Sequence, residues 1–142
     1  MSTIRYGVLF ALLAGLPAAC SNSPTSPSNT APFSQTDLVA GTGTAAATGQ
    51  TLTVNYTGWF YDGSRPDQKG LIFDTTLGKS PFSFTLGSGE VITGWEQGIP
   101  GMQVGGVRRL VIPPSLAYGG TRSGAIPAST TLVFEIELLS AQ

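Results

Sequence analysis

The feature that most constrains this fold is the alternation of apolar and polar residues along residues 51–60. A period of two places every second side chain on one face of an extended chain, which is typical of a β-strand with one buried side. Residues 82–86 and 130–139 repeat the pattern, so we predict three strands that share one core. The positions expected to face inward are Leu52, Val54, Tyr56, Gly58, Phe60, Phe82, Phe84, Leu86, Leu132, Phe134, Ile136 and Leu138.

Three shorter extended segments complete the predicted sheet, at residues 37–40, 71–74 and 107–112. The chain of 142 residues holds 19 glycines and 10 prolines, and only 11% of its residues are charged. This composition favours a β protein with many turns, and the length suffices for one domain.

One helical segment interrupts the strands. Thr93, followed three residues later by Glu96, fits a capping box that starts a helix. The glycines and the proline that follow keep this helix short. Trp95 falls in its first turn, where it is either the plug of a small core or the floor of a pocket. The predicted architecture is therefore an α+β fold, with an antiparallel sheet curled over one short helix.

Composition also excludes several classes of function. A formal net charge of −1 gives no electrostatic basis for binding nucleic acid. The chain has no histidine, which removes the commonest general base and the commonest metal ligand. Its one cysteine, Cys20, excludes an internal disulfide and argues against a cysteine-ligated zinc site. We therefore expect no metal and no cofactor.

Residues 1–19 have the features of an export signal, with Arg5 near the start, an apolar run too short to span a bilayer, and small residues after it. The segment Leu16-Pro-Ala-Ala-Cys20 resembles a bacterial lipobox, although Pro17 stands where that motif usually has leucine. The resemblance implies cleavage before Cys20 and acylation of its thiol. It also implies anchoring to a membrane of the bacterial cell envelope that faces the periplasm or the exterior. Ordinary signal-peptidase cleavage is the alternative.

Residues 20–35 are polar and rich in proline, and they cannot bury enough apolar surface to fold. We predict that they form a flexible tether, and that residues 36–142 form the folded domain.

An ordered set of short motifs covers residues 49–139. The motifs are Val54-Asn-Tyr-Thr-Gly-Trp59, Phe73-Asp74, Pro81-Phe82, Leu86-Gly87, Glu90-Val-Ile-Thr-Gly-Trp95, Gly98, Met102, Val104-Gly105, Pro114, Ala117-Tyr-Gly119, Ile126-Pro127 and Thr131-Leu-Val-Phe134. In this order and spacing they resemble the FK506-binding type (FKBP type) of peptidyl-prolyl cis–trans isomerase. The resemblance implies an antiparallel half-barrel of five or six strands wrapped round one short helix. It also implies an enzyme that accelerates rotation about Xaa–Pro bonds while exported proteins fold.

The resemblance further implies a pocket and its partners. It assigns catalysis to Tyr56, Asp74, Tyr118 and Phe134, and substrate binding to Phe73, Phe82, Glu90, Val91, Ile92, Trp95 and Ile126. Trp95 is then the pocket floor. The backbone of Ile92, the hydroxyl of Tyr118 and the backbone carbonyl of Glu90 are the groups that contact the ligand. The expected partners are proline-containing polypeptides and macrolide inhibitors of the FK506 and rapamycin type, bound by a monomer.

Several positions keep more than one interpretation. Asp74 either holds Tyr56 or orients toward the twisting carbonyl, and without the resemblance it is an exposed turn residue. Lys79 is a candidate partner for Asp74, because residues 75–80 lack the arginine that many family members place there. Arg108 lies on an apolar strand face, so it needs a partner if it is buried. For the whole domain, the alternatives are a peptide-binding module with little turnover and a purely structural surface domain.

Overall fold

The computed structural model describes residues 30–142, so Cys20, the predicted signal segment and most of the predicted tether lie outside the described residues. The strands of the described part are β1 (Ser34–Val39), β2 (Thr51–Tyr61), β3 (Lys69–Thr75), β4 (Phe82–Thr85), β5 (Val107–Ile112) and β6 (Leu132–Ala141). Its helices are α1 (Thr93–Gly98) and the short 3-10 helix η2 (Pro114–Leu116). Neither of these two helices is long or apolar enough to cross a membrane.

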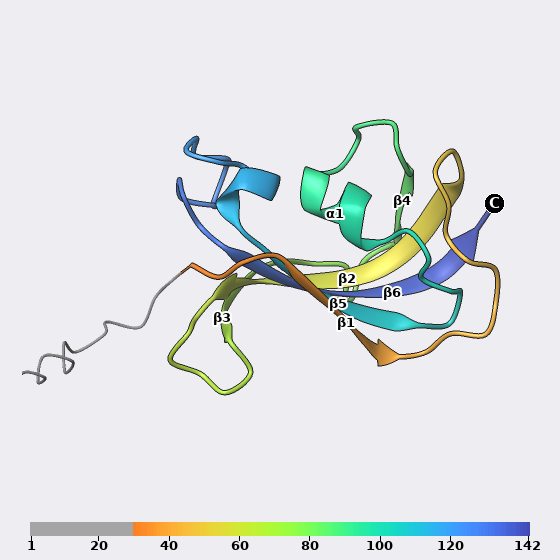
Figure 1. Ribbon diagram of the computed structural model, residues 1–142, viewed down its shortest axis with the longest axis horizontal. Helices are drawn as coiled ribbons and strands as arrows, with labels where there is room; N and C mark the ends of the chain where they lie inside the picture. Colours follow the sequence, from red (N-terminus) through yellow and green to blue (C-terminus); the bar gives the residue numbers. More distant parts are fainter. Residues whose placement is uncertain (1–29) are drawn as a thin grey trace, which may run out of the picture.

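The six strands form one antiparallel sheet. Its order is β1-β5-β6-β2-β3, and β4 pairs with the first half of β2 while β3 pairs with the second half. Figure 1 shows the sheet curving beneath α1, which lies against its concave side. The predicted antiparallel sheet of five or six strands around one short helix is confirmed, with six strands.

The core lies between the concave face of the sheet and α1. The inward positions predicted along β2 and β6 supply its centre, and Leu52, Val54, Leu132, Ile136 and Leu138 are each 0% exposed. Tyr56 and Phe82 were also expected to face inward, yet Tyr56 is only partly buried and Phe82 is exposed, at 37%. The reason is that these two aromatic side chains border a cavity instead of packing on all sides.

Helix α1 packs so closely on β5 that two of its residues have no room for a side chain. A Cβ atom on Gly94 would lie 2.5 Å from Cγ2 of Ile112, and one on Gly98 would lie 2.6 Å from Cδ2 of Leu110. Both separations are well below van der Waals contact, so a larger residue would push the helix off the sheet. This close packing of α1 on β5 fixes the position of Trp95, which is 4% exposed.

The predicted capping box at the start of α1 is wrong. The N-cap residue is Ile92, and no side chain caps the helix. The carboxylate of Glu96 instead accepts hydrogen bonds from the backbone N–H groups of Gly87 and Gly89, at 2.5 and 3.1 Å. These loop amides have no strand to pair with, so the acidic side chain satisfies them and ties the loop before α1 to the helix.

Four strands extend beyond their predicted bounds, and one of them, β2, does so by a single residue, to Tyr61. β1 begins at Ser34 and thus includes the last two residues of the predicted tether, and β6 ends at Ala141. β3 begins at Lys69 because its backbone pairing with β2 continues past the apolar run, to the pair of Tyr61 and Lys69. The apolar pattern marks only the part of a strand that is buried, whereas hydrogen bonding sets its full length.

The buried arginine has the partner that its position required. Arg108 is 6% exposed, and its Nε lies 2.6 Å from Oδ1 of Asp37 on β1. Its Nη1 donates to the carbonyls of Gly98 and Pro100, at 2.7 and 3.2 Å. The hydrogen bond from Arg108, together with its positive charge, lowers the pKa of Asp37. One side chain therefore joins β1, β5 and the end of α1.

Candidate functional site

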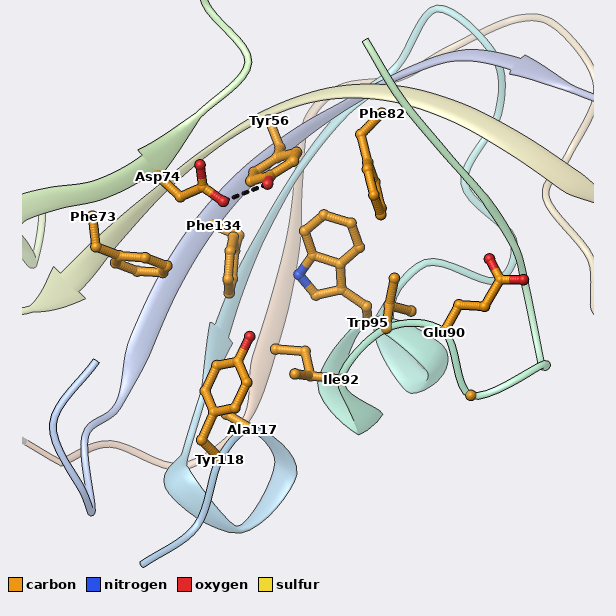
Figure 2. A pocket seen from close by; sticks show the side chains of 12 residues that line it. Tyr56, Phe73, Asp74, Phe82, Glu90, Ile92, Trp95, Ala117, Tyr118 and Phe134 are labelled. Carbon is orange, nitrogen blue, oxygen red and sulfur yellow. Dashed lines mark hydrogen bonds between the residues drawn. The ribbon is translucent and has the colours of Figure 1, made fainter. Parts of the chain in front are cut away.

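A cavity of about 400 Å³ opens on the concave side of the sheet, between strands β2, β3, β4 and β6, helix α1, the loop before α1 and the loop that follows η2. Its lining consists of Tyr56, Phe73, Asp74, Phe82, Gly89, Glu90, Val91, Ile92, Trp95, Ala117, Tyr118 and Phe134. Figure 2 shows aromatic side chains from strands, helix and loop converging on this space. An apolar wall with a few polar groups is typical of a site that binds an organic ligand or a peptide segment.

A β-bulge in β3 turns two successive side chains, those of Phe73 and Asp74, toward the cavity. Gly58 pairs with Asp74, whereas the next residue, Trp59, pairs with Ile72, so β3 has one extra residue at Phe73. Successive residues of a regular strand point to opposite faces, and the extra residue removes that alternation here. Gly58 leaves room for the aromatic ring, because a Cβ atom at this position would lie 2.7 Å from Cζ of Phe73.

Trp95 forms the floor of the cavity. Its ring meets those of Tyr56 and Phe134 at nearly right angles, with centroids 5.1 and 5.3 Å apart. The indole Nε1 is buried and has no hydrogen-bond partner within residues 30–142. Figure 2 shows the edge that carries this nitrogen turned toward the face of Phe134. An aromatic face is a weak acceptor for an N–H group, which accounts for an otherwise unpaired donor.

Tyr56 and Asp74 form the polar pair of the site. The phenol of Tyr56 donates to Oδ2 of Asp74 at 2.5 Å (Figure 2), and Oδ1 of Asp74 accepts from the backbone N–H of Thr75 at 2.9 Å. Burial, and then the neighbouring carboxylate, raise the pKa of Tyr56, so the phenol keeps its proton. The contact expected if Asp74 holds Tyr56 is thus present. No ion pair joins Lys79 to Asp74 in the described part of the chain.

Thr76 fills the gap between β3 and β4 along β2. The backbone N–H of Tyr56 donates to the hydroxyl of Thr76 at 3.0 Å, and the backbone N–H of Thr76 donates back to the carbonyl of Tyr56 at 2.9 Å. The same hydroxyl donates to Oδ1 of Asn55 at 3.1 Å. Thr76 is 7% exposed, so it replaces the missing strand as the hydrogen-bond partner of Tyr56.

Besides the indole N–H of Trp95, two hydrogen-bond donors that are expected to contact a ligand have no protein partner among residues 30–142. One is the hydroxyl of Tyr118, which Figure 2 shows directed toward Ile92 and Phe134. Burial, and then the charge of Asp74, raise the pKa of Tyr118, so this phenol also stays protonated. The other donor is the backbone N–H of Ile92, the N-cap residue of α1. Both groups are available to carbonyl oxygens of a ligand.

Tyr118 is positioned by a tight turn. The loop after η2 closes through a hydrogen bond from the N–H of Gly119 to the carbonyl of Pro114, at 2.7 Å. Gly119 adopts a φ of 60°, a left-handed conformation that glycine reaches without strain. The motif Ala117-Tyr-Gly119 therefore forms a turn that places the tyrosine side chain at the cavity.

The structure brings ten of the eleven predicted pocket residues together, and Ile126 is the exception. Ile126 is 7% exposed and belongs to the hydrophobic core, where it forms a small antiparallel bridge with Ser123. Ile126 therefore belongs to the same buried cluster as Trp95 and Phe134 and does not line the cavity. For Glu90, the predicted contact is the backbone carbonyl, and its carboxylate accepts from the N–H of Thr85 at 3.1 Å.

Sequence reasoning missed two lining residues, Gly89 and Ala117. Gly89 has a φ of 81°, so the spacing of glycines at 87 and 89 was a signal for a turn that leaves backbone at the cavity wall. Ala117 lies within the motif that identified Tyr118, but a small apolar side chain carries no chemical signal of its own.

Residues 42–139 match the family model described as FKBP-type peptidyl-prolyl cis-trans isomerase. The FK506-binding protein of Neisseria meningitidis serogroup A is 44% identical over 105 residues, which cover 72% of this chain and 90% of that protein. The FK506-binding protein 4 of Neurospora crassa is 46% identical over 103 residues, covering 72% of this chain and 21% of that protein. The chain thus spans about a fifth of the length of the fungal relatives it matches.

Two solved structures share the fold. The crystal structure of AtFKBP13 has a TM-score of 0.66 and 36% sequence identity, covering 78% of this chain and 93% of that one. The crystal structure of FkpA from Escherichia coli has a TM-score of 0.65 and 36% identity, covering 80% of this chain and 52% of that one.

Proposed function

This chain belongs to the family of FKBP-type peptidyl-prolyl cis–trans isomerases, and we propose that it accelerates rotation about Xaa–Pro bonds of polypeptides held in the cavity. The observation that carries this proposal is the cavity itself. It has aromatic walls, a tryptophan floor, and two donors without a partner in the described part of the chain, the Tyr118 hydroxyl and the Ile92 N–H, beside the Tyr56–Asp74 pair.

The reaction needs no nucleophile and no proton carrier. The barrier to rotation about a peptide bond is about 18–20 kcal/mol because the amide loses its conjugation as it twists. No covalent bond forms or breaks, so a chain without histidine lacks nothing that the chemistry requires. The protein must bind the twisted amide more tightly than the planar one. A rate gain of 10⁴ corresponds to about 5.4 kcal/mol of such differential binding.

The walls of the cavity favour the twisted form because a planar amide has a larger dipole than a twisted one. Transfer from water to an aromatic surface such as that of Trp95 costs the planar form more. The donors of Tyr118 and Ile92 hold the flanking carbonyl groups and fix the chain on either side of the rotating bond. Asp74 and Tyr56 keep each other in place beside that bond, so they act by position and charge.

The test is the cis-to-trans rate of a short Xaa–Pro peptide with and without the purified protein, followed in the presence of a macrolide of the FK506 or rapamycin type. We expect acceleration that the macrolide abolishes, since it occupies the same cavity. Binding of the peptide by a folded protein that gives no acceleration would assign the site to a peptide-binding module.

We also propose that residues 1–19 direct export and that Cys20 is acylated, so that the isomerase domain acts on exported proteins at a membrane of the cell envelope. The sequence features of the signal and the lipobox-like segment support this proposal. In bacterial cells, we expect the wild-type protein to sediment with membranes and to carry the mass of a lipid, and Cys20→Ala to lose both properties. An unmodified mature wild-type protein in the soluble fraction would contradict lipidation.

A further inference from the structure

Beside the cavity, β3 has an apolar outer edge that no other part of residues 30–142 covers. Leu71 and Ile72 are 74% and 57% exposed. β3 is the last strand of the sheet order and pairs only with β2, so its other side has no strand partner in the described chain. Backbone donors and acceptors on such an edge are free to pair with another extended chain.

The edge also lacks the charge that usually protects exposed edges. The only basic residue of β3 is Lys69, and its Nζ lies 2.5 Å from Oε1 of Glu135 and 4.3 Å from the ring centroid of Trp59. The lysine is thereby drawn back over the sheet. The only acidic residue of β3, Asp74, is hydrogen-bonded to Tyr56 at the cavity. Neither charged side chain lies at the edge formed by residues 71–73, where a lysine would normally discourage pairing with another strand.

We propose that the outer edge of β3, at Leu71 and Ile72, binds an extended apolar segment of the same polypeptide whose proline occupies the cavity, by strand addition. The inference rests on the proposed function of the cavity. Backbone hydrogen bonds supply the affinity in this binding mode, and alternate side chains supply the preference. Because adjacent strand residues point to opposite faces, Leu71 and Ile72 offer apolar contact on both sides of an added strand.

Continuity along β3 identifies the occupant. Phe73 and Asp74 line the cavity, and Leu71 lies two residues further along the same strand, a distance of about 7 Å. An extended chain that leaves the cavity covers this distance with two or three residues. The opposite edge strand, β1, exposes Leu38 and Val39 to a similar degree, 47% and 52%, but lies at the other end of the sheet order. It therefore provides a matched control.

The experiment compares three peptides with one Leu–Pro centre, namely the short peptide alone, the peptide with arms rich in valine and threonine, and the peptide with arms of glycine and serine. For the wild-type protein, we expect the KM for the apolar-armed peptide to be about tenfold lower than for the glycine–serine one. The Leu71→Lys/Ile72→Lys double variant should remove that difference, and Leu38→Lys/Val39→Lys should retain it. All three proteins should act equally on the short peptide.

The failures of the two proposals are distinguishable. No acceleration of the short peptide by the wild-type protein would overturn the proposed function, and this inference with it. Equal KM values for the two long peptides, with short-peptide turnover intact, would overturn strand addition alone. A dimer in sedimentation that the β3 double variant abolishes would assign the edge to a second copy and likewise overturn it. Leu71→Thr/Ile72→Thr repeats the test without added charge and should also remove the preference.

Discussion

The hydrogen bond between Tyr56 and Asp74 joins a wall of the cavity to the carboxylate beside it. Removing either partner breaks the same charge-assisted contact, which corresponds to about 1.5–3 kcal/mol. We therefore expect Tyr56→Phe and Asp74→Ala each to lower kcat/KM by about ten- to hundredfold. The kcat/KM of the double variant should be no lower than that of the less active single variant, because the pair works as one unit. Steady-state kinetics on a short Xaa–Pro peptide measure this, and additive losses would show that the two side chains act separately.

Thr76 holds the backbone of Tyr56 from the gap between two strands. Thr76→Val keeps the shape of the side chain but leaves the Tyr56 N–H and the Asn55 side chain without their partner. We expect a loss of about 1–3 kcal/mol in the free energy of unfolding, measured with denaturant, and recovery of most of it in Thr76→Ser. Thr53→Val is the control, since within residues 30–142 that hydroxyl bonds only to Ser83, at the surface, and its loss should change stability by less than about 0.5 kcal/mol. Equal losses in both valine variants would refute the bridging role.

Residue patterns predicted these contacts unevenly. The position of Asp74 came from its motif, whereas its bond to Tyr56 depends on the bulge at Phe73, which no local pattern marks. Thr76 and Glu96 were missed as supports because each bonds to backbone that only the folded chain brings near. A threonine and a glutamate in polar surroundings carry no sequence signal for such roles.

At the scale of elements, the strands were the most predictable part. Alternation along β2 and β6 identified the buried face because one side of each packs on a single core. The loop after η2 was less predictable. Its glycines marked turns. The bridge between Ser123 and Ile126 and the burial of Ile126 in the core depend on tertiary packing, which no local pattern indicates.

The close packing of α1 on β5 predicts that a larger residue at Gly94 destabilises the protein. A Cβ atom on Gly94 would overlap Ile112, so Gly94→Ala should lower the free energy of unfolding by about 1–3 kcal/mol and displace Trp95. The tryptophan emission of the folded variant should shift to the red as the indole gains water. Gly120→Ala is the control, because a Cβ atom there meets nothing within 4 Å. Unchanged stability and emission in Gly94→Ala would contradict the tight packing.

At the scale of the whole molecule, the ion pair of Asp37 and Arg108 links the first strand of the sheet to the core. The pKa of Asp37 is lowered from its ordinary value of 3.8, so the pair contributes stability above that pH, and the contribution is lost as the pH falls through the folded-state value. Asp62, whose pKa is lowered mainly by the hydroxyl of Ser64, adds in the same direction. We expect unfolding free energy to drop in acid.

Asp37→Asn tests this assignment. The variant should be less stable near neutral pH, because the buried guanidinium of Arg108 loses its charged partner, and its stability should fall less steeply in acid. On the alkaline side, burial raises the pKa of Tyr56 above its ordinary value of 10.0, so its contribution is complete below that pH and is lost above it. Both variant and wild type should therefore lose stability together in strong alkali. Denaturant titrations at a series of pH values measure the loss of stability in acid and in alkali. If the unfolding free energy of Asp37→Asn fell as steeply in acid as that of the wild type, the assignment would be contradicted.

The central claim is that this cavity lowers the barrier to prolyl rotation by binding a twisted amide, without moving a proton. The most direct measurement is the cis-to-trans rate of a short Xaa–Pro peptide, with and without the protein, in light and in heavy water. We predict a macrolide-sensitive acceleration of the same size in both solvents, since no proton transfer enters the rate. A folded protein that binds the peptide but leaves its rate unchanged, or an acceleration that falls markedly in heavy water, would contradict the claim.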